Sequence, residues 1–151
     1  MKLVDANVLL YADNEAARDH DLALEWLEDA LGRSETLLIP WVSLLAFLRI
    51  STHSGIQDRP HTVASAMRFL RAVTDSPRVI AGAPDGRHWE RVETLLEATG
   101  VGGNLVNDAH LAALAVQYDA TVVSFDNDFT RFPEVRWERP AAPTAPEGAR
   151  S

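Results

Sequence analysis

Cysteine is absent from this chain of 151 residues, and long apolar runs are absent as well. Without cysteine there is no disulfide, no thiolate metal site and no cysteine nucleophile, so a metal ion must be bound by oxygen or imidazole ligands. A membrane-spanning helix needs roughly 18 to 20 uninterrupted apolar residues, which no segment provides. The N-terminal residues also lack the architecture of a signal peptide. We therefore expect a soluble, cytoplasmic protein.

Positive charge is scarce, because 14 Lys and Arg residues face 22 Asp and Glu residues, giving a formal charge of −8. This balance disfavours a protein that holds nucleic acid by bulk attraction to phosphate. Two features soften the argument: bound divalent cations neutralise carboxylates, and local arginines can form a basic rim. The candidate rim residues are Arg49, Arg59, Arg68 and Arg71. Weak, transient binding of RNA is favoured over tight binding.

The length of the chain and its hydrophobic content of 46% suit one well-packed domain. Short apolar segments alternate with segments of helical periodicity, and no internal repeat is present. The predicted strands are 2–5, 36–39, 78–81, 121–125 and an edge strand at 135–137. One predicted helix directly follows the first strand. The others span 19–31, 42–50, a segment that begins at Pro60, a segment that begins at Pro84 and Asp85, and 104–118. This alternation predicts a largely parallel sheet covered by helices.

The C-terminal residues differ in composition from the rest of the chain. Pro140, Pro143 and Pro146 stand among alanine, threonine, glycine and serine. Such a segment buries too little apolar surface to offset the entropy lost on ordering. We therefore predict a domain at 1–138 and a disordered Pro/Ala-rich tail at 139–151.

Aspartates far apart in the sequence are expected to meet at one edge of the sheet. Asp5 ends the first predicted strand and Asp126 follows the strand at 121–125, at the edge where open α/β sheets bind ligands. Asp108 begins the buried stripe of the helix at 104–118, so its carboxylate points the same way as that stripe. Converging carboxylates repel one another, and no lysine or arginine lies within these motifs. A divalent cation follows, with Mg²⁺ preferred and Mn²⁺ as a substitute, which indicates phosphodiester hydrolysis.

Each of these residues also has a structural alternative. A single aspartate at a strand end is more often a helix cap than a functional group. Asn7 can cap the first helix or orient Asp5 through its amide. Asp128 can belong to a turn instead of a metal site. His110, two positions from Asp108, faces elsewhere on its helix, which favours a packing or surface role.

Three blocks of the sequence resemble a known family. The blocks are VDANVLL at 4–10, NDAHLAALA at 107–115 and VSFDNDF at 123–129. In this order they resemble the signature blocks of VapC proteins, the PIN-domain ribonucleases of type II toxin–antitoxin systems, and the similarity extends to about Trp137. The resemblance implies a three-layer α/β/α sandwich with a mostly parallel sheet, and a Mg²⁺- or Mn²⁺-dependent endoribonuclease acting on structured RNA of the tRNA or rRNA class.

The same resemblance implies partners and residue roles. It implies a homodimer, and Trp26, Trp41 and Trp89 are aromatic residues compatible with a dimer interface. It also implies inhibition by a VapB-type antitoxin that folds over the active site. Asp5 and Asp108 would be metal ligands, and Asp126 would complete the acidic cluster. Asn7 and the Ser124 hydroxyl would support these ligands without contacting the metal ion themselves.

One position departs from the family pattern. The family usually has a glutamate on the third helix, a few residues before an arginine, whereas here Ala46 precedes Arg49. No other acid lies between Trp41 and Gln57, so the metal site lacks one ligand or recruits another, for which Asp128 is the candidate. The missing ligand speaks against a second metal ion. Arg49 can meet a phosphate or an antitoxin carboxylate, with a surface ion pair as the alternative.

Two other functions stay open at this point. A catalytically weak PIN-like domain that acts by binding its partner or RNA is compatible with Ala46. A phosphoryl-transfer domain of the haloacid-dehalogenase or receiver type uses an aspartate as nucleophile, but Asn7 stands where such a phosphatase would carry a second aspartate. Substitution of Asp5 separates the first two readings, because only a ribonuclease would lose RNA cleavage.

Overall fold

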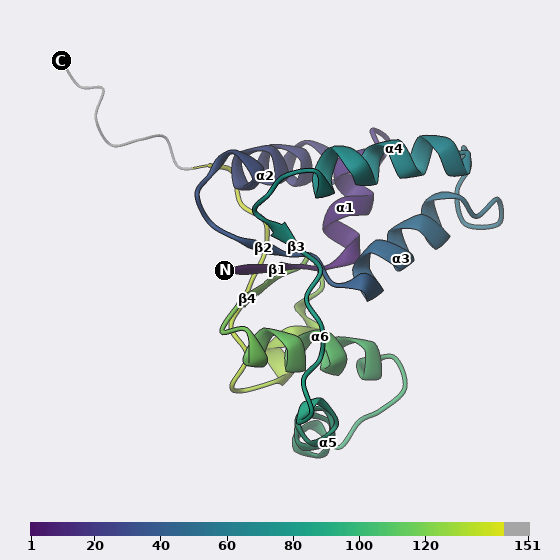
Figure 1. Ribbon diagram of the computed structural model, residues 1–151. Coiled ribbons are helices and arrows are strands. Elements are labelled where there is room, and N and C mark those ends of the chain that lie inside the picture. Colours follow the sequence, from purple (N-terminus) through teal and green to yellow (C-terminus); the bar gives the residue numbers. More distant parts are fainter. Residues whose placement is uncertain (144–151) are drawn as a thin grey trace.

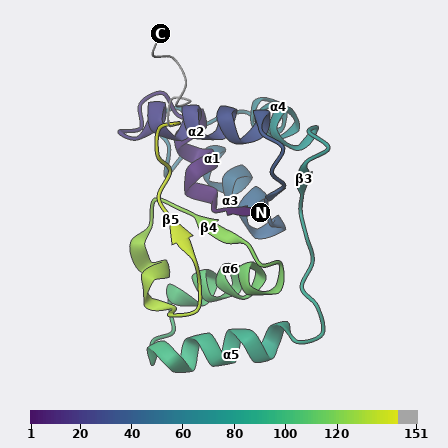
Figure 2. The same cartoon turned by 90° about the vertical axis from the view of Figure 1, so that its left-hand side faces the viewer.

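The computed structural model describes residues 1–143, and they form a parallel five-stranded sheet between two layers of helices (Figures 1 and 2). The strands are β1 (Lys2–Val4), β2 (Leu37–Leu38), β3 (Val79–Ile80), β4 (Thr121–Val123) and β5 (Trp137–Glu138). The helices are α1 (Ala6–Asp13), α2 (His20–Gly32), α3 (Trp41–Ser51), α4 (Val63–Thr74), α5 (His88–Thr99), α6 (Leu105–Gln117) and the 3-10 helix η1 (Asn127–Arg131). The predicted three-layer α/β/α fold is confirmed.

The strand order β3-β2-β1-β4-β5 places the first strand at the centre of the sheet. Leu3 of β1 lies opposite Leu38 of β2 on one side and Val122 of β4 on the other. Because all pairs are parallel, the carboxyl ends of β1, β2 and β4 meet at one edge, and the loops that follow them start side by side. The central pair β1–β4 therefore brings the first block of the sequence next to the last.

Alternate residues of the strands feed two separate hydrophobic clusters, one on each face of the sheet. Leu3 and Val122 belong to the cluster formed with α5 and α6, here called the α5–α6 cluster. Val4 and Val123 belong to the cluster formed with α1 to α4, here called the α1–α4 cluster. Figure 1 shows the two helical layers above and below the strands. Burial on both faces explains why these strands read as continuous apolar runs.

Two helices begin later than the prolines suggested. α4 begins at Val63, because the Thr62 side chain accepts a hydrogen bond of 3.1 Å from the Ser65 N–H and so caps the helix. α5 begins at His88, because Asp85 accepts from the Arg87 N–H at 2.9 Å and forms a turn of its own before the helix. In both cases a side-chain oxygen near the proline, and not the proline itself, sets the start.

The last described residues run back toward the sheet edge. Arg139 donates to the Phe125 carbonyl oxygen and to Asp19 Oδ2, each at 3.2 Å, and its guanidinium lies 4.9 Å from the centroid of the Phe125 ring. Pro140 is buried. Residues 144–151, which make up most of the predicted tail, lie outside the described residues, so the domain boundary stays a prediction. None of the helices in the described part is long and apolar enough to cross a membrane.

Candidate active site

The aspartates predicted to converge lie at the carboxyl edge of the sheet. Asp5 directly follows β1, and its N–H donates to the Val123 carbonyl oxygen of β4 at 3.1 Å, which extends the strand pairing by one step. Asp126 follows β4 after two residues, as the first residue before η1. Asp108 lies in the first turn of α6. The sheet and the start of α6 therefore hold three carboxylates that are distant in sequence.

Asp5 is fixed in place through both of its carboxylate oxygens. Oδ1 accepts from the Ala6 N–H at 2.7 Å, which caps α1. Oδ2 accepts from the Ser124 hydroxyl at 2.7 Å and from the Asn7 amide at 3.1 Å. Asp5 thus has a set orientation before any ligand arrives.

Asn7 and Ser124 form a hydrogen-bond network in which every donor has an acceptor. The Asn7 amide also donates to Ser124 Oγ at 2.9 Å, and its carbonyl oxygen accepts from the Phe125 N–H at 3.1 Å. Ser124 Oγ accepts in addition from the Asp126 N–H at 3.0 Å. The Asn7 amide therefore contacts Asp5, and the residue that caps α1 is Asp5 itself.

Asp108, Asp126 and Asp128 bring one carboxylate oxygen each within 4.8 Å of one another. Asp126 accepts from the Asp128 N–H at 2.9 Å, so the turn that starts η1 also sets the spacing of these two side chains. All three residues are half-buried. The turn predicted for Asp128 and its approach to the acidic cluster are therefore features of the same structure.

The pKa values of the aspartates are those expected for carboxylates that lie close together without a cationic partner. Burial, together with the charges of Asp5, Asp126 and Asp128, raises the pKa of Asp108 to about 7. Burial also raises the pKa of Asp5, against the opposing effect of the Ser124 and Ala6 hydrogen bonds. Within residues 1–143, none of these carboxylates forms an ion pair with a lysine, arginine or histidine. The four aspartates thus act on one another as a single cluster of negative charge.

Sequence reasoning missed two contacts that support the site from the last strand. The Trp137 indole N–H donates to the Ser124 carbonyl oxygen at 3.2 Å, and Arg139 binds the neighbouring carbonyl of Phe125. Both acceptors are backbone atoms, so no residue type in the sequence signals the contact. β5 and the residue after it therefore hold residues 124–125 from the side of β4 opposite β1.

Helix α3 supplies no carboxylate to the site. Ala46 is half-buried, and Arg49 is exposed, with no ion pair in the described part of the chain. Of the other candidate rim residues, Arg59 lines a pocket at the end of α1 and Arg71 lines a groove between α3 and α4. Neither pocket includes one of the four aspartates.

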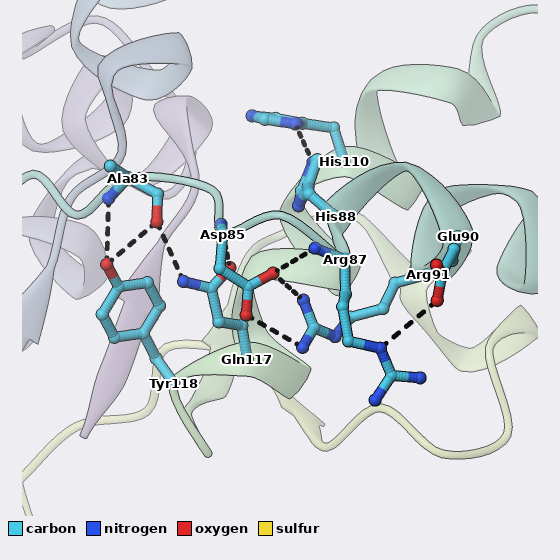
Figure 3. Close-up of polar contacts among 9 residues, drawn as sticks. All are labelled: Ala83, Asp85, Arg87, His88, Glu90, Arg91, His110, Gln117 and Tyr118. Carbon is cyan, nitrogen blue, oxygen red and sulfur yellow. Dashed lines mark hydrogen bonds and ion pairs between the residues drawn. The ribbon is translucent and has the colours of Figure 1, made fainter.

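His110 takes part in a polar network outside the acidic cluster (Figure 3). Its Nδ1 lies 2.8 Å from His88 Nε2, with the two rings edge to face, and burial lowers the pKa of both imidazoles. Nearby, Arg91 binds Asp85 with two hydrogen bonds of 2.6 and 3.1 Å. The contact between His88 and His110 attaches α5 to α6, which agrees with the packing role predicted for His110, whereas the pair of Arg91 and Asp85 attaches α5 to the loop before it.

Comparisons with known proteins place this arrangement in a family. The model of the PIN domain family matches residues 2–135. Ribonuclease VapC37 of Mycobacterium tuberculosis is 44% identical over 142 residues, which cover 94% of this chain and 99% of the relative. Ribonuclease VapC31 of the same species is 36% identical over 140 residues, covering 93% and 99%.

Solved structures share the fold at lower identity. A chain of VapBC2 from Rickettsia felis, bound to a DNA fragment from the promoter, has a TM-score of 0.66 and 21% identity, covering 91% of this chain and 97% of that one. A chain of FitAcB from Neisseria gonorrhoeae has a TM-score of 0.64 and 16% identity, covering 93% and 98%. These structures confirm the expected fold, and the family model and the curated relatives confirm the expected family. The chain therefore belongs to the PIN domain family, among the VapC ribonucleases of toxin–antitoxin systems.

Proposed function

We propose that this VapC ribonuclease cleaves structured RNA of the tRNA or rRNA class, with Mg²⁺ or Mn²⁺ held by Asp5, Asp108, Asp126 and Asp128. The observation that carries the proposal is the approach of three carboxylates within 4.8 Å, beside a fourth whose charge raises the pKa of Asp108. Carboxylate oxygens are the ligands that hard divalent cations prefer. The uncompensated charge of the cluster fits a cation, because removing it from contact with water without one is costly.

The residues of the chain have separate tasks in this reaction. A divalent cation in the cluster would stabilise the negative charge that develops on the phosphate group and activate a water molecule. Ser124 and Asn7 hold Asp5 in a fixed orientation, so little reorganisation is needed on binding. The Asp128 N–H does the same for Asp126. At neutral pH the Asp108 carboxyl group is protonated in part of the molecules and ionised in the rest. A divalent cation that binds the cluster would displace this proton.

The absence of a carboxylate at Ala46 weakens the site without removing it. Four aspartates remain, and Mg²⁺ tolerates water in place of a missing protein ligand. Asp128 takes the place of the absent glutamate in this proposal, because its carboxylate lies within 4.8 Å of those of Asp108 and Asp126. A single metal ion is sufficient for the chemistry we propose.

The partners follow from the relatives and from the exposed surface. We propose a VapB-type antitoxin as inhibitor, since the structurally similar chains come from VapBC and FitAcB complexes. We also propose that the protein acts in the cytoplasm, where RNA is available. We also propose a homodimer, because the side chains of Trp41 and Trp89 are 63% and 78% exposed. Trp26, in contrast, packs against the α1–α4 cluster. Light scattering of the antitoxin-free protein tests the dimer, and a monomer at micromolar concentration would refute it.

The test of the activity is RNA cleavage by purified protein, freed of any partner, with Mg²⁺, Mn²⁺ or a chelator. Asp5→Ala is compared with Thr62→Ala, because each removes a side-chain oxygen that caps a helix. We expect metal-dependent cleavage that Asp5→Ala abolishes and Thr62→Ala preserves. Loss of the cap should cost about 1 kcal/mol of stability in each variant, and Asp5→Ala also leaves the Ser124 hydroxyl and the Asn7 amide without this acceptor. Equal cleavage by Asp5→Ala and the unaltered protein would favour a domain that acts by binding alone.

A further inference from the structure

The hydroxyl of Ser43 is buried and has no hydrogen-bond partner. The residue is 1% exposed, and its Oγ is unpaired in the described part of the chain. Serine within a helix usually escapes this state by donating to a carbonyl oxygen three or four residues earlier. Ser51 on the same helix does so, with its Oγ 3.5 Å from the Leu48 carbonyl oxygen. An unpaired buried hydroxyl costs folding free energy, and a bound ion or water is one of the explanations for such an atom.

Ser43 lies at the same sheet edge as the four aspartates. In the parallel pairing of β1 with β2, Leu3 stands opposite Leu38, so two residues further on Asp5 falls beside Pro40. Ser43 follows within the first turn of α3, and its N–H donates to the Pro40 carbonyl oxygen at 2.9 Å. The loop that carries Asp5 and the start of α3 are therefore neighbours, and α1 packs against α3.

The neighbours of Ser43 on α3 show which way its side chain faces. Val42 packs against the α5–α6 cluster, whereas Leu44 belongs to the α1–α4 cluster. Trp41 and Leu45, on the opposite side of the helix, are 63% and 60% exposed. Ser43 therefore faces the interior between the two clusters, at the sheet edge from which Asp5 also projects.

We propose that Ser43 is a further residue of the metal site and supplies a neutral oxygen ligand to the divalent cation. This inference rests on the metal site proposed above. The hydroxyl is suited to this position because it adds an oxygen donor without adding charge to four crowded carboxylates. It also gives α3 a place in the site, although Ala46 offers no polar atom. The ligand set is then four aspartates and one serine, for a hard cation such as Mg²⁺ or Mn²⁺.

The first test compares Ser43→Ala with Ser51→Ala, a matched control on the same helix with a buried hydroxyl that has a partner. Mn²⁺ binding is measured by isothermal titration, and the stability of metal-free protein by urea unfolding. We expect Ser43→Ala to weaken Mn²⁺ binding about tenfold while the metal-free protein becomes no less stable, because an unsatisfied group is removed. Ser51→Ala should leave the affinity unchanged. Unchanged Mn²⁺ affinity in Ser43→Ala would overturn the proposal.

The second test detects contact between the side chain and the metal directly. The chain has no cysteine, so S43C places a single thiol at this position, and S51C places one at the control position. With Co²⁺ bound, a thiolate ligand produces an intense charge-transfer absorption, which we expect for S43C and not for S51C or the unaltered protein. Co²⁺ binding to all three proteins without that absorption would refute the role of Ser43 and leave the aspartate site intact. Failure of every protein to bind Co²⁺ would refute both.

Discussion

The hydroxyl of Ser124 donates a hydrogen bond of 2.7 Å to Asp5 Oδ2, although 119 positions separate the two residues in the chain. The contact depends on β1 and β4 being neighbours in the sheet, so the order of the strands, and not the local sequence, creates it. It also lowers the pKa of Asp5 against the effect of burial. Folding and the preparation of the acidic cluster are therefore linked through this pair.

Ser124→Ala should lower both stability and RNA cleavage. The variant removes the hydroxyl donor to Asp5 and the acceptor for the Asp126 N–H. We expect a loss of about 1–3 kcal/mol in the free energy of unfolding and a fall in the cleavage rate of about 10-fold to 100-fold. Urea unfolding and single-turnover cleavage measure the two effects. A double-mutant cycle with Asn7→Ala is the control, and additive losses would contradict the shared network.

The metal-free protein should lose stability as the pH rises from about 4 to 7. The pKa of Asp108 is raised from 3.8 to about 7, so between these values the folded state binds a proton that the unfolded state has released. Its contribution therefore favours folding at acidic pH and disappears above pH 7. Because other groups titrate in this range, unfolding is compared at pH 5.5 and 8 with Asp108→Asn. We expect the variant to gain stability relative to the unaltered protein at both values, with a gain about twice as large at pH 8 as at pH 5.5.

Metal affinity should change with pH in the opposite sense. A cation that binds the cluster displaces the proton of Asp108, so Mn²⁺ affinity should fall by up to about tenfold per unit below pH 7. Titration calorimetry in buffers of different ionisation enthalpy counts the protons released at pH 6 and pH 8. Release of the same number of protons at both values would contradict the assignment of Asp108 as a ligand.

Asp128→Asn should weaken Mn²⁺ binding without unfolding the turn. The hydrogen bond that shapes this turn uses the backbone N–H of Asp128, which the variant keeps, whereas its carboxylate lies in the acidic cluster. We expect affinity to fall about 10-fold, and thermal unfolding to change little. Asp58→Asn, at an exposed position away from the cluster, removes the same charge and should leave affinity unchanged. Equal behaviour of the two variants would leave Asp128 with a purely structural role.

Gly82→Ala should destabilise the connection between β3 and α5. Gly82 has a φ of +64°, and an added Cβ would lie 2.5 Å from Leu38 Cδ1 and 3.2 Å from the Tyr118 ring. We expect a loss of more than about 1 kcal/mol in the free energy of unfolding. Gly86→Ala is the matched control in the same connection, since nothing lies within 4 Å of its added Cβ. Similar stability of the two variants, measured by urea unfolding, would refute the expected clash.

The convergence of Asp5 and Asp126 could be predicted from sequence because it depends on topology. Once strands alternate with helices, a parallel sheet follows, and the residues after its strands meet at one edge. The helix periodicity around Asp108 then pointed a third carboxylate to the same place. The capping roles of Asp5 and Asp126 were equally predictable, and the structure combines the two roles in the same side chains.

Other features of the site depend on partners that a sequence does not identify. Trp137 and Arg139 bind backbone carbonyl oxygens, which every residue carries, so their side chains gave no signal. The start of α5 was misplaced because Asp85 closes its own turn before the helix begins. Ser43 could not be identified from the sequence, because a serine in an apolar helix becomes a candidate only when its burial and its missing hydrogen-bond partner are known.

The indole N–H of Trp137 donates a hydrogen bond to the carbonyl oxygen of Ser124, and the hydroxyl of Ser124 donates one to Asp5. The protein therefore carries a fluorophore attached to the site through a single residue. Trp41 and Trp89 are exposed and emit from a water-like environment, so changing both to phenylalanine leaves the emission of the more buried indoles. A change in that emission on filling the acidic cluster would report its occupancy optically, with no label attached and no RNA present.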